Sequence, residues 1–259
     1  MRPRDAFEDL APYYDAIMSH VDYDRWFTAT TALASLIRGP LRHLDAACGT
    51  CVLLRQLRKV GWRSVGIDLS LSMLRTARSE GDRLPIANAD LRALPMHRAF
   101  DYVTCLFDSI NFLLTIEDVG AVFREFASAL VDGGLLYFDV VTERMVTEHF
   151  AGQRWDEEDG GLATSWHGEY CTKTRIAETH VRVKNGPSST IRERTYLPEE
   201  IEAALAGAGF RLIAAMDAQT WGPIRRRTVR IDYLATTGDL KFMTKRFESL
   251  RAGVRKLLR

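Results

Sequence analysis

Hydrophobic positions along the chain follow two different periods. Between about residues 41 and 141, short apolar runs typical of strands alternate with amphipathic stretches typical of helices. The run FDYVTCLF is almost continuously apolar, as expected of a strand that is covered on both faces. This alternation predicts a parallel sheet with helices on both faces. The expected strands are LRHLDAA, RSVGID, LPIANAD, FDYVTCLF and LLYFDVV, with DGG as a turn before the last, and the expected helices span residues 50–60, 70–80 and 116–130.

The flanking regions have other patterns. Helical spacing from Phe7 to Met18 and again over residues 23–37 predicts two helices before the first strand, and Gly39-Pro40 ends the second. Residues 162–196 hold short alternating runs, which predict an antiparallel insertion. A helix opening at Pro198 and the strands FRLIAAMD and TVRIDYLAT follow. The tail from residue 239 has one apolar helical face, and we expect it to pack on this protein or on a partner copy rather than on a membrane surface.

Composition narrows the class of protein. With 259 residues and 46% hydrophobic content, the chain can form one compact body. Its 35 basic residues against 34 acidic ones make a nucleic-acid partner unlikely. No apolar run approaches the roughly 20 residues of a membrane span, and the N-terminus lacks the pattern of a signal peptide, so we expect a cytoplasmic protein with reduced thiols.

The stretch LDAACGTCVLL places Cys48 and Cys51 between an expected strand and an expected helix. A redox dithiol suits that position, because a helix N-terminus lowers a thiol pKa. Such a domain, however, does not need two preceding helices and does not explain the acidic strand ends that follow. Zinc would require four ligands, and Cys105 and Cys171 stand alone, so we predict no metal site.

A nucleotide-binding turn accounts for more of the chain. Asp45, Asp68 and Asp90 each end one of the first three expected strands, so their carboxylates share one edge of a parallel sheet. Asp68 follows the turn at the spacing of a carboxylate that accepts hydrogen bonds from ribose hydroxyls. Only Gly49 is left of any phosphate-binding glycine pattern, which favours an adenosine ligand without phosphates.

Five segments carry a family resemblance. HLDAACGTC, VGIDLSLSML, ANADLRALP, FDYVTCLFDSINFL and LVDGGLLYFDV together resemble the successive motifs of class I S-adenosylmethionine-dependent methyltransferases. YYDAIM, DYDRW and the β-rich insertion resemble a bacterial branch that methylates N or O of small molecules. The resemblance implies a Rossmann-like, seven-stranded, mostly parallel α/β sheet. It implies a helical lid at residues 1–40, a core at 41–141 and 198–237, a β-rich substrate cap at 142–197 and an amphipathic C-terminal helix at 238–259.

The same resemblance implies S-adenosylmethionine as cofactor and assigns residues to it. Asp45 and the turn Ala47, Cys48 and Gly49 would hold its methionine end, and Leu106 would lie nearby. Asp68 would bind the ribose, Leu69 would pack on the adenine, and Asp90 with Leu91 would read the adenine edge. Tyr14 and Trp26 come from a segment that folds over the cofactor in related enzymes. The family usually has glycine at the positions of Ala47 and Cys51.

Methyl transfer from a sulfonium is an in-line displacement, so positioning the acceptor matters most. An amine acceptor needs only to be deprotonated, whereas an alcohol needs a base. The catalytic candidates are Asp108, Asn111, Tyr14, His167 and His180. Asp108 is equally well explained as a helix cap, and the two histidines as structural residues.

The function expected from these features is methyl transfer to N or O of a small organic acceptor. A nucleic-acid methyltransferase is the first alternative, supported by RRRTVR at residues 225–230 and by the basic tail. A non-catalytic cofactor-binding module is the second. The aromatic insertion and the amphipathic tail are compatible with a homodimer.

Overall fold

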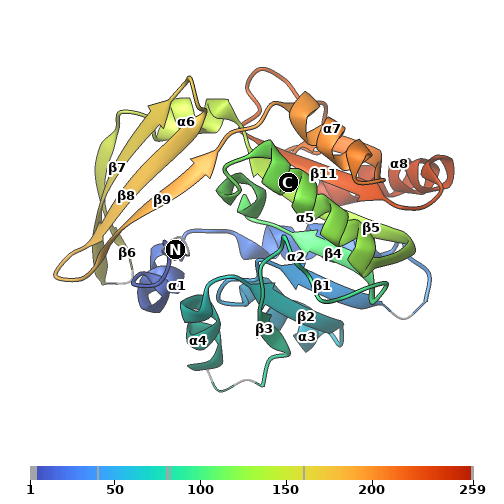
Figure 1. The fold of residues 1–259 in the computed structure, drawn as a ribbon, viewed down its shortest axis with the longest axis horizontal. Helices are drawn as coiled ribbons and strands as arrows, with labels where there is room; N and C mark the ends of the chain where they lie inside the picture. The colour runs from blue at the N-terminus through green and yellow to red at the C-terminus, as the bar shows by residue number, and fades with distance from the viewer. Residues whose placement is uncertain (1–4, 40, 80, 82, 160, 258–259) are drawn as a thin grey trace.

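The computed structural model describes residues 5–257 except 40, 80, 82 and 160. The helix breaker Pro40 and the last two residues of the tail therefore lie outside the described residues. The chain forms two sheets, one central and one projecting to the left in Figure 1. None of the helices in the described ranges is both long enough and apolar enough to cross a membrane.

The central sheet has seven strands in the order β10-β11-β5-β4-β1-β2-β3. Strands β3, β2, β1, β4 and β5 are parallel, whereas β11 is antiparallel to both of its neighbours. This arrangement confirms the predicted Rossmann-like, mostly parallel sheet. The strands are β1 Arg42–Ala46, β2 Arg63–Asp68, β3 Ile86–Asn88, β4 Phe100–Cys105, β5 Leu130–Val141, β10 Arg211–Asp217 and β11 Arg230–Thr236.

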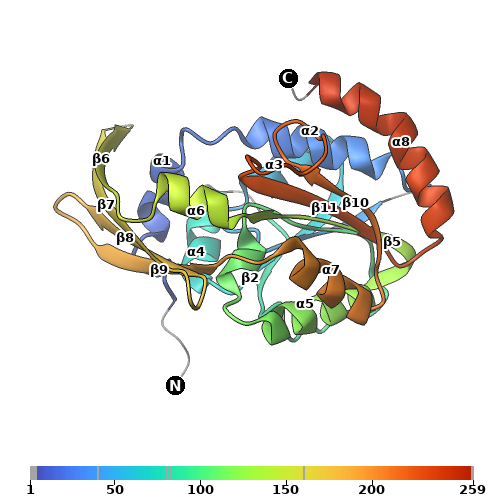
Figure 2. The same ribbon diagram turned by 90° about the horizontal axis from the view of Figure 1, so that it is seen from above.

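Helices cover both faces of this sheet (Figure 2). Helices α5 (Ile116–Ala129) and α7 (Pro198–Gly207) bury Phe123, Phe126 and Leu205 against one face. The opposite face carries α2 (Tyr23–Ala34), α3 (Val52–Lys59) and α8 (Leu240–Leu257). Helix α4 (Leu71–Ser79) follows β2 and contacts β2 and β3.

The C-terminal helix α8 packs on the protein itself. Met243, Phe247 and Val254 are buried and belong to the same core as α2 and α3. The tail's apolar face is therefore used within the chain, as expected, and is not left for a membrane surface.

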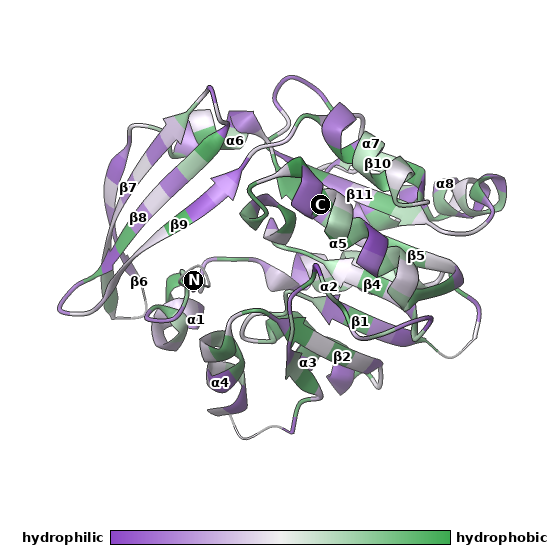
Figure 3. Ribbon diagram, viewed as in Figure 1, coloured by the Kyte–Doolittle hydropathy of each residue, from purple (hydrophilic) through white to green (hydrophobic). Residues whose placement is uncertain are grey.

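The second sheet is the predicted antiparallel insertion. It contains β6 (Arg154–Asp159), β7 (Leu162–Cys171), β8 (Ile176–Val183) and β9 (Ser188–Arg194), paired in that order. Its residues alternate between a buried and a more polar face, which Figure 3 shows as bands along β7 and β8. The buried face packs on the N-terminal segment, which includes η1 (Ala11–Tyr13) and α1 (Tyr14–Ile17).

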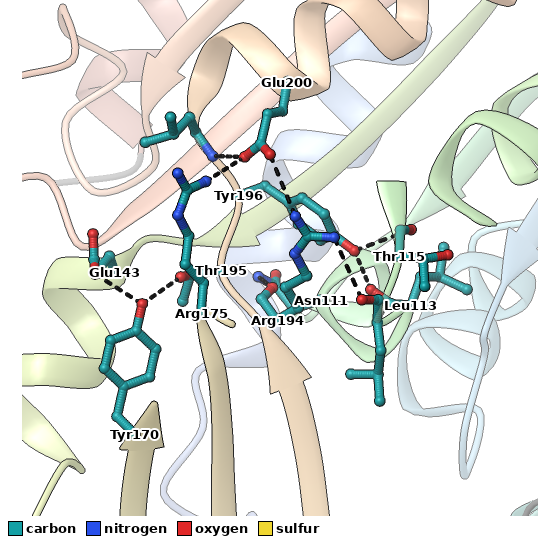
Figure 4. A network of polar contacts seen from close by, with 12 residues as sticks. Asn111, Leu113, Thr115, Glu143, Tyr170, Arg175, Arg194, Thr195, Tyr196 and Glu200 are labelled. Atoms are coloured by element: carbon teal, nitrogen blue, oxygen red, sulfur yellow. Dashed lines mark hydrogen bonds and ion pairs between the residues drawn. The ribbon is translucent and has the colours of Figure 1, made fainter. Parts of the chain in front are cut away.

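A polar network joins the second sheet to the core where β9 leads into α7 (Figure 4). Glu200 pairs with Arg175 at 2.7 Å and with Arg194 at 3.4 Å, and it accepts the backbone N–H of Leu197 at 2.8 Å. The Tyr196 hydroxyl donates to the carbonyl of Leu113. These bonds fix the orientation of β9, whose side chains reach the site described below.

Two local predictions are wrong, and one part of the insertion was not predicted. The spacing from Phe7 predicted one helix, but only η1 and the four-residue α1 form, because Pro12 lacks the N–H that a helix passing through it would need. The DGG turn instead lies within β5, where a register irregularity absorbs the extra residues. Within the expected cap at 142–197, helix α6 (Glu143–His149), capped by Thr142, and strand β6 come before the alternating runs at 162–196.

Candidate active site

The order of strands in the central sheet reverses between β1 and β4, and ligands of open α/β sheets bind in the crevice at such a point. The turn after β1 lies there. Ala47, Gly49 and Cys51 all have positive φ, at 58°, 53° and 69°. The Gly49 N–H donates to the carboxylate of Asp68 at 2.8 Å, which joins the turn to the end of β2. Ala47 and Cys51 thus hold a left-handed backbone that glycine adopts without strain.

The turn packs closely against Gly66 of the neighbouring strand β2. A Cβ added to Gly66 would lie 2.8 Å from the Cys48 sulfur and 2.9 Å from Leu54. Gly66 on β2 is therefore required by the approach of the turn, and not by its own backbone angles.

Two carboxylates lie at this edge, Asp45 buried and Asp68 half-buried. Burial raises the pKa of Asp45 to about 7, partly offset by a hydrogen bond from Thr104 at 3.1 Å. Burial also raises the pKa of Asp68, against the backbone N–H groups of Ser70 and Gly49. Next to Asp68, Leu69 exposes 61% of its surface, which provides an apolar face beside the carboxylate.

The third aspartate lies differently from the prediction. Strand β3 ends at Asn88, so Asp90 lies two residues beyond it. Its carboxylate is held by Arg92 at 2.7 Å, and Arg92 also reaches Asp118 at 3.3 Å. The Arg92 guanidinium lowers the pKa of Asp90. Leu91, next to Asp90, is partly buried against the core.

A second charged cluster lies at the carboxyl ends of β4 and β5. Phe107 and Asp108 are consecutive residues with positive φ, at 61° and 52°. The fully buried Asp139 carboxylate accepts both of their backbone N–H groups, at 2.6 and 3.1 Å. Arg230, at the start of β11, pairs with Asp139 and lies 3.3 Å from the carboxylate of Asp108. This left-handed turn is thus held in place by a buried ion pair.

Glu193 of β9 brings a third carboxyl to the cluster. Burial and, to a smaller extent, the neighbouring charge of Asp108 together raise its pKa to about 8. Glu193 and Asp108 are hydrogen-bonded to each other. The Oε1 atom of Glu193 is buried and accepts no hydrogen bond from an N–H or hydroxyl group of the described residues. An unpartnered buried carboxyl oxygen costs stability unless a ligand supplies a donor.

Aromatic side chains line the space beside this cluster. Tyr23 stacks on Phe107 with ring centroids 5.8 Å apart, and Trp26 meets Phe107 edge-on at 5.3 Å. The Arg230 guanidinium lies 5.7 Å from the Trp26 ring. Burial raises the pKa of Tyr14, as do the nearby charges of Tyr23, Asp108 and Asp68. Tyr14 thus lies between the Asp68 end and the Asp108 end of the site.

The N-terminal segment is bonded directly to the turn. Asp15 of α1 accepts a hydrogen bond from the Thr50 hydroxyl at 2.5 Å, and Asp24 of α2 accepts one from Gln56 at 2.7 Å. These contacts hold the segment that carries Tyr14 and Trp26 over the crevice.

Other sequence candidates have different roles. Asn111 of η2 (Ser109–Phe112) is fully buried, and its side chain bonds the backbone of Val141 and Arg194. It fixes the junction of the two sheets and has no group free for an acceptor. Asp108 makes no capping hydrogen bond to η2 among the described residues, so the cap interpretation is wrong. Leu106, largely buried, directly follows the end of β4 and precedes the turn at Phe107 and Asp108; its place beside the methionine end of the cofactor stays a prediction.

His167 and His180 do not reach the site. Along β8, the buried residues Ala177, Thr179 and Val181 alternate with His180, which therefore lies on the outer face of the second sheet. His167 is paired with His180 in register and lies on that same face. Their prediction as bases is wrong, because Glu193 approaches from the opposite face of the sheet.

The structure also argues against the redox interpretation of the opening cysteine pair. Cys48 and Cys51 are free thiols with sulfur atoms 3.5 Å apart. The hydrogen bond to Cys51, followed by burial, raises the pKa of Cys48. A redox-active dithiol requires a lowered thiol pKa.

Sequence reasoning missed three important residues. Arg230 belongs to the basic run at residues 225–230 that had suggested nucleic acid, but it is turned into the site. Asp139 lies inside an apolar strand. A charged residue within such a run is rarely buried without a partner, and this could have marked Asp139 as a candidate. Glu193 alternates with exposed residues of β9, and nothing in the sequence showed what its face would meet.

Comparisons with known proteins agree with this geometry. Residues 44–134 match the family model described as a methyltransferase domain. The putative methyltransferase YqeM of Bacillus subtilis (strain 168) is 30% identical over 218 residues, which cover 80% of this chain and 87% of that protein. A crystal structure of an S-adenosylmethionine-dependent methyltransferase from Clostridium acetobutylicum ATCC 824 has a TM-score of 0.77 at 25% identity, covering 89% of this chain and 98% of that one.

The name of a third relative also states what that protein methylates. The dTDP-4-amino-2,3,4,6-tetradeoxy-D-glucose N,N-dimethyltransferase of Saccharopolyspora spinosa is 32% identical over 131 residues, which cover 49% of this chain and 52% of that protein.

The fold and the crevice define a class I, Rossmann-like methyltransferase. This chain belongs to the S-adenosylmethionine-dependent methyltransferases, and S-adenosylmethionine is its cofactor.

Proposed function

We propose that this enzyme methylates the nitrogen of a small amine, with the cofactor held at the turn after β1 and the amine held by Asp108 and Glu193. The observation that carries this proposal is the buried Oε1 of Glu193 beside Asp108, which accepts no hydrogen bond from an N–H or hydroxyl group of the described residues. An amine supplies the N–H donor that this oxygen lacks.

The residues of the crevice fit the cofactor. The buried Asp45 and the half-buried Asp68 flank the left-handed turn, and Leu69 offers an exposed apolar face. In our proposal Asp68 accepts the ribose hydroxyls, Leu69 covers the adenine, and Asp45 with Ala47, Cys48 and Gly49 holds the methionine end. Asp90, Leu91 and Leu106 complete the site. Bound S-adenosylmethionine supplies an electrophilic methyl group on a sulfonium.

The protein's own groups prepare the acceptor. A protonated amine has no lone pair for the displacement, so it must first lose a proton. With a pKa of about 8, the ionised form of Glu193 is a stronger base than an ordinary carboxylate, and in our proposal this form, which becomes the main one above about pH 8, accepts the proton. Burial raises the pKa of Asp108, and the Arg230 guanidinium 3.3 Å away acts against this shift; in our proposal the Asp108 carboxylate attracts the ammonium form before the transfer.

In our proposal the aromatic residues orient the cofactor and the acceptor and exclude water from the site. Tyr14 lies between the two charged ends, and Tyr23, Trp26 and Phe107 form an aromatic wall. Aromatic faces are attractive to a sulfonium or an ammonium cation. We propose that residues 1–40 act as a lid and that the second sheet, through Glu193, acts as the substrate cap.

A small-molecule acceptor suits the charge distribution better than nucleic acid. Arg230, the last residue of the basic run at 225–230, forms ion pairs with Asp139 and Asp108. The run therefore offers a smaller basic surface than its sequence suggests. We further propose a cytoplasmic enzyme, and a homodimer stays a prediction.

The test is methyl transfer from labelled S-adenosylmethionine to a panel of matched small amines, alcohols and carboxylates. Amines are expected to be the acceptors, and Glu193→Gln is expected to lower kcat by at least about tenfold with an unchanged affinity for the cofactor. Glu158→Gln, an exposed carboxyl on β6, is the matched control. Transfer to alcohols alone, or full activity of Glu193→Gln, would contradict the proposal.

A further inference from the structure

Two histidines face each other on the outer surface of the second sheet, away from the active site. His167 of β7 and His180 of β8 are directly paired, and their rings stack with centroids 5.8 Å apart. Glu169 lies two residues after His167, and therefore on the same face. One ligand atom from each of these three residues lies within 4.8 Å of the other two.

This donor set and its spacing suit a transition-metal ion. Zinc binds imidazole nitrogen and carboxylate oxygen at roughly 2.0–2.2 Å, which puts tetrahedral ligand atoms about 3.4 Å apart. The three ligand atoms therefore need to approach by up to about 1.4 Å, and side-chain rotation allows this because His167 and Glu169 are 28% and 61% exposed.

A neighbouring residue already orients one of the ligands. The Nδ1 atom of His180 lies 2.8 Å from the hydroxyl oxygen of Thr190 on β9. A hydrogen bond at Nδ1 leaves Nε2 free to bind a metal, and metal-binding histidines are commonly fixed in this way. The Nδ1 atom of His167 lies 3.9 Å from a carboxylate oxygen of Glu169, which is too far for a hydrogen bond. A metal ion between them would instead be bonded to both side chains.

The surroundings leave room for a fourth ligand. The histidines line a hollow of about 910 Å³ that also includes Arg154 and Arg182. Three protein ligands and an open position are typical of a metal that holds water or an anion. We propose that His167, Glu169 and His180 bind one zinc-like divalent ion that joins β7 to β8 and keeps one coordination position open to this hollow. The sequence had predicted no metal site, because these ligands become neighbours only when the strands pair.

The test is a calorimetric titration of the full-length, tag-free enzyme with zinc chloride. We expect one ion per chain, and at least tenfold weaker binding in both His167→Gln and His180→Gln. Thr190→Val, which removes only the orienting hydroxyl, is expected to weaken binding about tenfold. His97→Gln is the matched control, because His97 is an exposed histidine that also contacts a serine hydroxyl, at 3.1 Å.

A cobalt-loaded sample shows which atoms bind. Nitrogen and oxygen ligands are expected to give no thiolate charge-transfer band, whereas Cys171 or the Cys48–Cys51 pair as ligands would give one. Such a band, or unchanged zinc binding in both histidine variants, would overturn the proposal. S-adenosylmethionine binding, measured in the same samples, shows that each variant is folded and keeps this test separate from the proposed amine methylation.

Discussion

Replacing Glu193 with glutamine is expected to stabilise the enzyme increasingly as the pH rises. Burial raises the pKa of Glu193 from the ordinary 4.5 to about 8. The folded protein therefore keeps a proton that the unfolded chain releases above about pH 4.5, and each pH unit in this interval costs about 1.4 kcal/mol of folding free energy.

The sign and size follow from this difference. Stability due to this group is fully present below about pH 4.5 and is lost as the pH rises toward 8. Near pH 7 the loss is about 3 kcal/mol, and above pH 9 it levels off at about 5 kcal/mol. Glutamine avoids this loss, because it is neutral at every pH and its amide still donates a hydrogen bond to Asp108.

The assay is urea unfolding of the wild type, Glu193→Gln and the exposed control Glu158→Gln at about pH 5, 7 and 9. The difference between Glu193→Gln and the wild type should be small at pH 5 and grow to several kcal/mol at pH 9. A difference that stays constant across this range, or a variant less stable than the wild type at pH 9, would refute the raised pKa. The same variant should lose methyl transfer, which separates a functional carboxyl from one that serves stability.

Three further substitutions test the geometry around the site. Arg230→Met leaves Asp139 and Asp108 without their buried cation and should cost about 3–5 kcal/mol of unfolding free energy by urea denaturation, and a loss below 1 kcal/mol would argue against the ion pair. Gly66→Ala places a methyl group 2.8 Å from the Cys48 sulfur and should weaken cofactor binding by at least about tenfold in calorimetry, whereas unchanged binding would mean that the turn can shift freely. Ala47→Gly relieves a φ of 58° and should leave the melting temperature unchanged or higher, with a clear drop in melting temperature as the contrary outcome.

Much of the fold was readable in the sequence, because the parallel core is built from local signals. Strand β2 runs from Arg63 to Asp68, as its apolar run predicted, and the insertion forms the antiparallel sheet that its alternation suggested. Asp45 and Asp68 meet at the turn after β1, because parallel strands place their carboxyl ends at one edge of the sheet.

The acceptor end of the site was less accessible to such reasoning. Alternation along β9 and β8 shows that two faces exist, but not that Glu193 faces the core or that His180 faces away from it. Arg230 is 91 residues from Asp139 and 122 from Asp108, so their contact depends on the antiparallel pairing of β11 with β5. Only the assembled sheet brings these charges together.

Asp68 is the residue on which cofactor binding is expected to depend most directly. Calorimetric titration of the wild type, Asp68→Asn and Asp132→Asn with S-adenosylmethionine tests this, since Asp132 is an exposed surface aspartate paired with Arg98. The wild type and Asp132→Asn should bind equally, and Asp68→Asn should bind at least about a hundredfold more weakly, because hydrogen bonds to a charged group contribute roughly 1.5–3 kcal/mol each. Equal binding by all three proteins would contradict the proposed cofactor site.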